Sequence, residues 1–352
     1  MNDDIEIVEF EQRHAEQVSR FRAVFPLRDR MRSAGYYAWK YGPNPAGRPE
    51  VLLALRRGEI VGVHAAIPRI FKVEDREVVV YEFQDSYVRP DFQRRGIFRT
   101  LTERIIDRIR SRGHLFYYVV PNELAAPIWM TGFRMWEPFG LASLSLGPSI
   151  SSRVAEHCTA LTRVQFFMRT ANLIDRVGFA CTMRRTTGLE VAVVRGGSNV
   201  ANVNVSIGLQ MAPVHVRRDS AYLRWRYDAN PEYLSIAEVT ELGRPAGLLV
   251  WRIAVSGATR RAYLVDVMSM PGRLRSMTRL AVSLMLGVGA STISALSISG
   301  SPLATELLLA GFRTRPGGPR LLVCPAFRND PFGPFMRQPE RWFLSLGDTG
   351  DI

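Results

Sequence analysis

The sequence predicts an α/β protein in which mixed β-sheets are flanked by helices. Segments with strand-like and helix-like patterns alternate from residue 5 to about residue 146, in the order β, α, β, β, β, α, β, α, β. This order requires a mixed sheet with helices on its faces. Short motifs of the first half recur in the second half, which indicates two similar domains. The length of 352 residues and the hydrophobic fraction of 47% allow two complete cores.

The elements of the first half follow from hydrophobic periodicity and turn residues. Residues 78–88 form the clearest strand, because they are rich in β-branched and aromatic side chains. Residues 97–112 are predicted to form a helix, since isoleucines and a leucine recur at four-residue spacing, and Gly113 suits a left-handed cap. The other expected elements are strands at 5–10, 51–55, 60–67 and 114–120 and helices at 13–25 and 123–130.

Beyond Gly188 the pattern is again rich in strands. Strands are expected at 190–194, 200–207, 234–242, 247–255, 262–268 and 292–298, and helices at 274–286 and 304–310. Residues 148–187 carry a helical pattern without a strand signal and are interpreted as a connector.

Two motifs recur at nearly the same offset. Trp39-Lys-Tyr-Gly-Pro-Asn-Pro45 returns as Trp225-Arg-Tyr-Asp-Ala-Asn-Pro231, 186 positions later, and Thr131-Gly-Phe-Arg134 returns as Ala310-Gly-Phe-Arg313, 179 positions later. A duplicated domain explains both matches, and chance recurrence of short strings is the alternative. The expected division is a catalytic domain at 1–147, the helical connector at 148–187 and a second, degenerate domain at 188–352.

The chain carries a formal net charge of +13, with 46 lysines and arginines against 33 aspartates and glutamates. Lys40 and Lys72 are the only lysines, so arginine supplies nearly all of the positive charge. The excess either reflects a preference for arginine on an ordinary solvated surface or attracts an anionic cofactor, substrate or polymer.

The cysteines and the apolar segments bound the class of protein. Cys158, Cys181 and Cys324 are odd in number and widely spaced, which excludes a disulfide scaffold and a structural zinc site, so no metal is expected. The acidic first residues are unlike a secretory signal. The most apolar stretch, 280–296, is interrupted by polar residues and is shorter than the roughly 20 residues of a spanning helix. A cytoplasmic protein without a membrane span is expected.

Residues 88–98, Val-Arg-Pro-Asp-Phe-Gln-Arg-Arg-Gly-Ile-Phe, join the clearest strand to the amphipathic helix. Gly96 lets the backbone approach a ligand closely, and the unpaired N–H groups of the first helical turn lie beside it. Arg94, Arg95 and Arg99 add positive charge to the positive end of the helix dipole. This turn is a predicted anion site that suits a pyrophosphate, and a basic turn without a ligand is the alternative.

The turn resembles the acetyl-CoA loop of the GCN5-related N-acetyltransferases (GNAT), Val-x-Pro-x-x-Gln/Arg-x-x-Gly-x-Gly/Ala. Val88, Pro90, Gln93 and Gly96 match in register, whereas Phe98 replaces the final small residue. The order of elements over 1–147 is also similar to that family, so tandem GNAT-like domains are expected. The resemblance implies that acetyl-CoA is bound by Val88, Gln93, Arg94, Arg95, Gly96, Ile97, Phe98, Arg99 and Asn122.

Acyl transfer to an amine needs a base, because an ammonium has no lone pair with which to attack. Glu82 lies eleven residues before Gln93, where histone-type GNAT members place their glutamate base. A carboxylate inside an apolar sheet would have its pKa raised toward neutrality, which suits this role. The alternative is a structural ion pair between Glu82 and one of the many arginines.

The resemblance also implies that a backbone N–H near Tyr87 or Val88 polarises the thioester carbonyl. The tyrosine that many members use as general acid is replaced by Trp129, which cannot protonate a thiolate. Asn122 could contact the pantetheine arm or cap a helix. The thiolate leaves unassisted or receives its proton from one of Tyr87, Tyr117 and Tyr118.

The recurring Trp-Lys/Arg-Tyr-x-x-Asn-Pro segments resemble those of GNAT-like proteins of bacterial surface-polysaccharide biosynthesis. An acceptor site that stacks a sugar ring would use Trp39, Tyr41, Trp225, Arg226 and Tyr227. The alternative is that these aromatic side chains are core anchors. Asp348 in the acidic tail either binds the acceptor amine or belongs to a frayed end.

These observations predict transfer of an acetyl group from acetyl-CoA to a primary amine on a small molecule, such as an anionic amino sugar or polysaccharide precursor. The corresponding segment of the second half, 265–275, has Gly272 but lacks the loop spacing, so no second CoA site is expected. Two alternatives remain: a related tandem transferase that uses aminoacyl-tRNA, and a basic nucleic-acid-binding protein without catalysis. Nucleic acid is the less expected partner, and the chain is expected to be a monomer or a homodimer.

Overall fold

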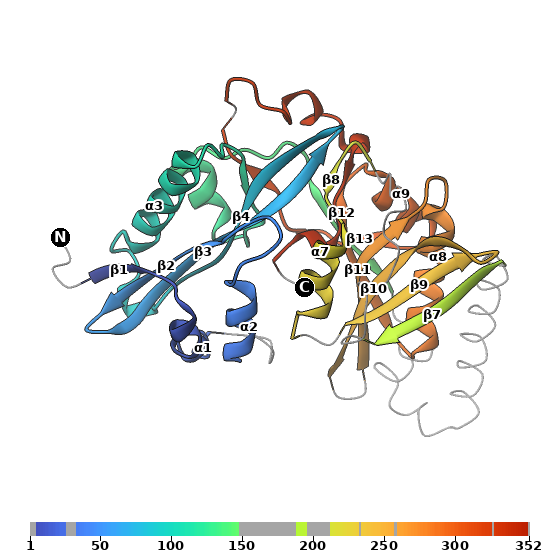
Figure 1. Ribbon diagram of the computed structural model, residues 1–352, viewed down its shortest axis with the longest axis horizontal. Helices are drawn as coiled ribbons and strands as arrows, with labels where there is room; N and C mark the ends of the chain where they lie inside the picture. Colours follow the sequence, from blue (N-terminus) through green and yellow to red (C-terminus); the bar gives the residue numbers. More distant parts are fainter. Residues whose placement is uncertain are drawn as a thin grey trace. The chain divides into compact units, whose positions relative to one another are not determined.

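The computed structural model describes residues 5–25, 33–147, 188–195, 212–231, 234–256, 259–325 and 327–350 (Figure 1). The predicted connector 148–187 and the predicted strand 200–207 lie outside the described residues.

The chain divides into two compact units, each of which includes segments from both halves of the sequence. The first unit comprises residues 1–138, 216–233 and 320–334, and the second comprises residues 139–215, 234–319 and 335–352. This division differs from the expected linear boundaries. The strand Leu322–Val323, from the second half of the sequence, joins the sheet of the first unit, and the strand Leu141–Leu146, from the first half, joins the sheet of the second unit.

The sheet of the first unit runs in the order β1-β2-β3-β4-β5-β14. All neighbours along this path are antiparallel except β4 and β5, which are parallel. The strands are β1 (Ile5–Glu9), β2 (Glu50–Arg56), β3 (Glu59–Val73), β4 (Arg76–Val88), β5 (Tyr117–Val119) and β14 (Leu322–Val323).

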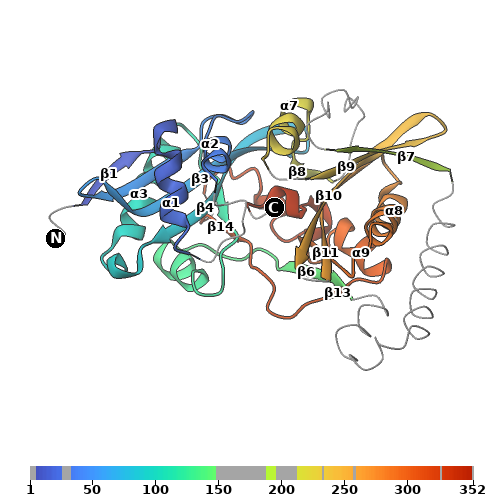
Figure 2. The same ribbon diagram turned by 90° about the horizontal axis from the view of Figure 1, so that it is seen from below.

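Helices cover both faces of this first sheet (Figures 1 and 2). Helix α3 (Ile97–Ser111) packs on β2, β3 and β4, and α1 (Ala15–Arg22) and α2 (Ala34–Lys40) pack together on the other face. Shorter helical segments complete the unit: η1 (Gln12–His14), η3 (Pro90–Phe92), η4 (Ile128–Gly132), α7 (Ser220–Leu223) and η6 (Arg224–Asp228).

The sheet of the second unit runs in the order β13-β6-β12-β11-β10-β9-β7, and its one parallel pair is β11 and β12. The strands are β6 (Leu141–Leu146), β7 (Leu189–Arg195), β9 (Ser235–Glu241), β10 (Arg244–Ser256), β11 (Thr259–Ser269), β12 (Thr292–Ile298) and β13 (Arg313–Thr314). Helix α8 (Leu274–Gly287) packs on β10 and β11, and α9 (Pro302–Leu309) packs on β12 and β6.

The remaining short elements include those near the end of the chain. β15 (Trp342–Phe343) pairs in parallel with β8 (Val214–Val216), and the helical turns are η7 (Gly333–Phe335), η8 (Pro339–Arg341) and η9 (Leu346–Asp348).

Both parallel strand pairs separate after three residue pairs. The last pair in the first unit includes Phe83 of β4, and the last pair in the second unit includes Tyr263 of β11. Two positions later each of these strands contains one extra residue, at Asp85 in β4 and at Val265 in β11. A bulge bends a strand and increases its twist, so both sheets open at the corresponding place.

The predicted mixed α/β architecture is confirmed, and most element boundaries agree within a few residues. The predicted strand 114–120 is shorter, because Pro121 follows it and has no N–H to donate. The predicted helix 123–130 is displaced to a wide turn at Ile128–Gly132, and α2 was not expected. No helix among the described residues has the length and the apolar character that a membrane span requires.

Gly247 tests the packing of the second sheet, because a Cβ there would lie 2.2 Å from the Met268 carbonyl oxygen. We predict that Gly247→Ala lowers the free energy of unfolding by about 2 kcal/mol or more, as overpacking against backbone does. Gly35→Ala is the control, since a Cβ at Gly35 in α2 meets nothing within 4 Å and alanine favours a helix. Urea unfolding measures both, and equal stability of the two variants would contradict the packing described.

Candidate functional site

The loop between β4 and α3 places glycine at a position that requires it. Gly96 is the N-cap of α3 and has a φ of 79°, in the left-handed region that a side chain disfavours. A Cβ at Gly96 would meet nothing within 4 Å, so the space in front of the helix N-terminus is open. Gln93 stabilises the loop, because its Nε2 donates a hydrogen bond of 3.2 Å to the Val88 carbonyl oxygen.

The backbone N–H groups from Arg94 onward in this loop have no backbone acceptor in the described part of the chain. Among the described residues, none of the N–H groups from Arg94 to Arg99 donates to a carbonyl oxygen outside α3. The first turn of a helix leaves such groups without partners and concentrates positive potential there. The side chains of Arg94, Arg95 and Arg99 are exposed around them, and the site is therefore suited to phosphate oxygens.

Phe92 anchors the loop beneath these arginines. Its ring is buried, and the guanidinium carbons of Arg89 and Arg95 lie 4.5 Å and 5.0 Å from its centroid. Arg89 is also held by two hydrogen bonds to Asp91, of 2.7 Å and 2.9 Å. Cation–π contacts and charge-assisted hydrogen bonds thus fix the backbone that carries the free N–H groups.

The separation of β4 from β5 exposes a strand edge beside the loop. Within the described part of the chain, β4 continues from Gln84 to Val88 with no strand partner on the β5 side. Asp85 adopts a φ of 51°, which is uncommon for a residue with a side chain and marks the bulge. An extended ligand could pair with this edge, as the resemblance implies for the pantetheine arm.

The two departures from the GNAT pattern, Phe98 and Trp129, pack against each other. Their ring centroids lie 5.4 Å apart in an edge-to-face arrangement. Phe83 lies 5.1 Å from Trp129, and His64 stacks on Phe83 at 5.1 Å. We call His64, Phe83, Phe98, Trp129 and Phe133 the aromatic cluster. The two large side chains at Phe98 and Trp129 therefore compensate each other in packing.

His64 is a buried histidine that stays neutral. Its Nδ1 lies 2.9 Å from Ser86 Oγ, and its Nε2 has no hydrogen-bond partner among the described residues. Burial lowers its pKa from 6.5 to about 3, despite an opposing effect of Asp85. At neutral pH the ring therefore contributes packing and one hydrogen bond rather than charge.

Glu82 forms a buried ion pair with Arg69. Its Oε2 accepts hydrogen bonds from Arg69 Nε at 3.0 Å and Arg69 Nη2 at 2.6 Å, and Gln84 Nε2 donates to the same oxygen. Both charged side chains are about 1% exposed. Burial alone would lower the pKa of Arg69, but the adjacent carboxylate raises it above its usual value.

This ion pair bears on the predicted base. Breaking a buried ion pair leaves one partner as an uncompensated charge, which is costly, so Glu82 and Arg69 hold each other in place. The geometry favours the ion-pair alternative stated above, and the role of Glu82 as the base stays a prediction. Arg69, which the sequence analysis did not single out, lies opposite Val80 in the β3–β4 register.

Asp85 at the bulge belongs to a second buried charge pair. Lys40 Nζ lies 2.7 Å from Asp85 Oδ2, and the Tyr41 hydroxyl donates to the same carboxylate at 3.0 Å. Burial raises the pKa of Asp85, but Lys40 and Arg22 outweigh it and the net shift is downward. Tyr41 is 4% exposed, so it anchors the core near the bulge and has little surface for an acceptor sugar.

Tyr87 packs under a buried arginine at the end of β4. The Arg22 guanidinium carbon lies 3.1 Å from the centroid of the Tyr87 ring, and Phe25 lies 5.1 Å from it. The role of Tyr87 in catalysis stays a prediction. Asn122, predicted to bind the cofactor, accepts a hydrogen bond of 2.8 Å from the Ala125 N–H through its side-chain oxygen, as its capping alternative requires.

The two recurring tryptophan segments come together in the first unit. Trp39 Nε1 donates a hydrogen bond of 2.8 Å to the Trp225 carbonyl oxygen, and the two rings stack at 5.6 Å. Arg226 and Tyr227 are 4% and 1% exposed, which agrees with the core-anchor alternative for these two residues. Trp225 is half-buried and lines a surface pocket.

In the second unit, the C-terminal segment lies between the separating strands β11 and β12. Ser345 Oγ donates to Asp266 of β11 at 3.0 Å, and Ser297 of β12 donates to the Leu344 carbonyl oxygen at 2.9 Å. Asp348 is buried and accepts a hydrogen bond of 2.9 Å from the Ser345 N–H. Asp348 is therefore neither frayed nor exposed to solvent.

Comparisons with known proteins agree with this site. The model of the acetyltransferase (GNAT) domain family matches residues 11–130. This part of the chain matches a GNAT acetyltransferase domain. That domain includes β4, the loop and α3, and it supports acyl transfer to an amine with acetyl-CoA as co-substrate. The comparison with curated proteins gives no match.

Two solved structures share the fold. A GCN5-related N-acetyltransferase from Anabaena variabilis ATCC 29413 is 11% identical with a TM-score of 0.59. A protein from Enterococcus faecalis V583, described as a probable N-acyltransferase, is 9% identical with a TM-score of 0.58. Each likeness covers 91% of this chain and 72% of the other. In the described parts of the chain, no cluster of three or more His, Cys, Asp or Glu residues could hold a metal ion.

The neutral state of His64 gives a testable pH dependence. As the pH falls below 6.5, the unfolded chain binds a proton at this residue before the folded chain does, so stability is complete above pH 6.5 and is lost toward pH 3. Between pH 7 and pH 5, the wild type should therefore lose about 2 kcal/mol more of its free energy of unfolding than His64→Phe does. The phenyl ring of this variant fits the aromatic cluster and cannot bind a proton.

Urea unfolding at the two pH values measures this difference. His14→Gln, a change at a half-exposed ring, is the control and should retain the wild-type pH dependence. The same loss of stability in wild type and His64→Phe would show that His64 is not held neutral by the fold.

Proposed function

We propose that the chain is an acyl-CoA-dependent N-acyltransferase that acetylates a primary amine of a small molecule, with the first unit as its catalytic domain. The observation that carries this proposal is the loop at 94–99, where free N–H groups and exposed arginines surround an open helix N-terminus. It lies inside the segment that matches the GNAT domain.

In this proposal the N–H groups of residues 94–98 bind the pyrophosphate of acetyl-CoA, and the pantetheine arm pairs with the free edge of β4. The thioester then lies at the bulge, where a backbone N–H near Tyr87 polarises its carbonyl. The neutral amine attacks the carbonyl carbon, the C–S bond breaks, and the departing thiolate takes the proton that the amine nitrogen gives up. Glu82 is left as a positioning group, because Arg69 holds it.

We further propose that the two units are a tandem repeat and that the second does not bind acyl-CoA. The matching bulges at Asp85 and Val265 support the repeat. The C-terminal segment already contacts both β11 and β12 where they separate, so the corresponding crevice is filled by the chain itself. An acceptor from polysaccharide biosynthesis, such as an amino sugar, remains the proposed substrate class.

Isothermal titration with acetyl-CoA tests the donor site. We predict that Gly96→Glu weakens binding at least a hundredfold, because a carboxylate would face the pyrophosphate and a side chain is strained at φ 79°. Gly113→Glu and Gly272→Glu are matched controls: both glycines have a similar positive φ and open surroundings, at the other end of α3 and before α8. Neither change should alter affinity.

The same titration counts the sites. One acetyl-CoA per chain is expected, since a free loop beside a free strand edge is found in the first unit and not among the described residues of the second. Two sites per chain, or a Gly272→Glu variant that binds more weakly than Gly96→Glu, would contradict the assignment of the catalytic domain. No saturable binding by the wild type would overturn the proposed function itself.

A further inference from the structure

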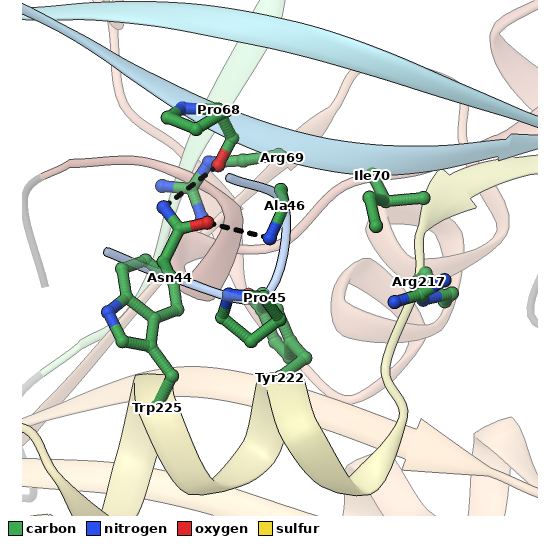
Figure 3. A pocket seen from close by; sticks show the side chains of 9 residues that line it. All are labelled: Asn44, Pro45, Ala46, Pro68, Arg69, Ile70, Arg217, Tyr222 and Trp225. Carbon is green, nitrogen blue, oxygen red and sulfur yellow. Dashed lines mark hydrogen bonds between the residues drawn. The ribbon is translucent and has the colours of Figure 1, made fainter. Parts of the chain in front are cut away.

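A pocket in the first unit lies between β3 and the helical segment α7–η6 (Figure 3). The space between its walls is about 240 Å³, most of which is open solvent rather than enclosed cavity. The walls are mostly apolar and aromatic, with two arginines, and the lining residues are Asn44, Pro45, Ala46, Pro68, Arg69, Ile70, Arg217, Tyr222 and Trp225.

Most polar groups of the pocket have partners within the protein. Asn44 donates to the Pro68 carbonyl oxygen at 3.2 Å and accepts from the Ala46 N–H at 2.8 Å, as Figure 3 shows. Arg217 at the pocket forms ion pairs of 2.7 Å with Glu77 and 2.8 Å with Asp219. These groups are satisfied without a ligand.

Two buried donors of the pocket have no partner. Arg69 Nη1 and Trp225 Nε1 are shielded from solvent, and neither has a hydrogen-bond acceptor among the described residues. The other two nitrogens of the Arg69 guanidinium are taken by Glu82, and the Trp225 ring is held in place by Trp39. Arg69 and Trp225 both line this pocket, as Figure 3 shows, together with Asn44.

The chemistry of these donors defines their ligand. Guanidinium and indole N–H groups donate hydrogen bonds and cannot accept them, so the missing partner must supply acceptor oxygens. A buried donor without an acceptor is costly, which makes an unexplained pair of them in one pocket informative. Because Arg69 carries a formal positive charge, an oxyanion fits better than a neutral hydroxyl.

We propose that this pocket binds an oxyanion, a carboxylate or a phosphate, on the acyl acceptor, with its oxygens on Arg69 Nη1 and Trp225 Nε1. This inference rests on the proposed function for the identity of the bound molecule. Pro45, Tyr222 and the Trp225 ring provide an apolar surface for the ring that carries the anion.

The position of Arg69 relates the pocket to the bulge in β4. Arg69 is bound to Glu82, which precedes the bulge at Asp85 by three residues on the same strand. At about 3.3 Å per residue, this separation is roughly 10 Å.

The test uses benzoate and inorganic phosphate as probes, with neutral benzamide as the matched control. The readout is the indole N–H resonance of Trp225 in a proton–nitrogen correlation spectrum, identified by its absence in Trp225→Phe. We expect benzoate or phosphate to shift this resonance saturably, and benzamide to leave it unchanged. Tighter binding of benzoate would indicate a carboxylate on the acceptor, and tighter binding of inorganic phosphate would indicate a phosphate.

Variants at Arg69 separate the anion contact from the fold. Arg69→Lys keeps a charge for Glu82 but removes the forked donor, and it should weaken probe binding about tenfold, as the loss of one charged hydrogen bond does. The double variant Arg69→Met with Glu82→Gln removes both buried charges together and should abolish binding. Arg217→Gln, at a residue already paired, should change affinity less than threefold.

Equal shifts with benzamide and benzoate, or unchanged probe affinity in Arg69→Lys, would overturn this inference. The absence of any saturable shift would show that water fills the pocket and would overturn it as well. Acetyl-CoA titration of the same variants separates the two proposals. If acetyl-CoA binds and the probes do not, only the anion pocket fails; if acetyl-CoA does not bind, the transferase function fails.

Discussion

The separation of β4 from β5 is the constraint on which the candidate site depends. The two strands are parallel and pair at three positions only, because β5 ends before Pro121 and β4 bulges at Asp85. If the pairing of β4 with β5 continued, β5 would form hydrogen bonds with the N–H and C=O groups along this edge of β4. Its early end leaves an edge that a linear molecule can pair with, and the same strand leads directly to the anion-binding loop before α3.

The charges around this edge have separate roles. Glu82 with Arg69 and Asp85 with Lys40 are buried pairs that fix the side of β4 facing α1 and α2, whereas the arginines of the loop are exposed to solvent. The aromatic cluster fixes the opposite side of the strand, with His64 kept neutral by burial.

Local signals in the sequence predicted the fold class, the loop and α3, because hydrophobic period and a glycine before a helix act over short distances. Partners distant in sequence were not predictable in the same way. Trp225 contacts Trp39 in the first unit, and the strand at Leu322–Val323 completes the first sheet, although both follow the first half by many residues. Arg69 could have been found, since the β3–β4 hairpin register places it near Glu82.

Hydrogen exchange with and without acetyl-CoA tests the central claim most directly, because it reads the backbone N–H groups themselves. Binding should slow exchange in the peptide that spans residues 93–99 and along the free edge of β4, and should leave the counterpart segment at 269–275 unchanged. Protection confined to the second unit, or none at the loop while acetyl-CoA is bound, would contradict the account.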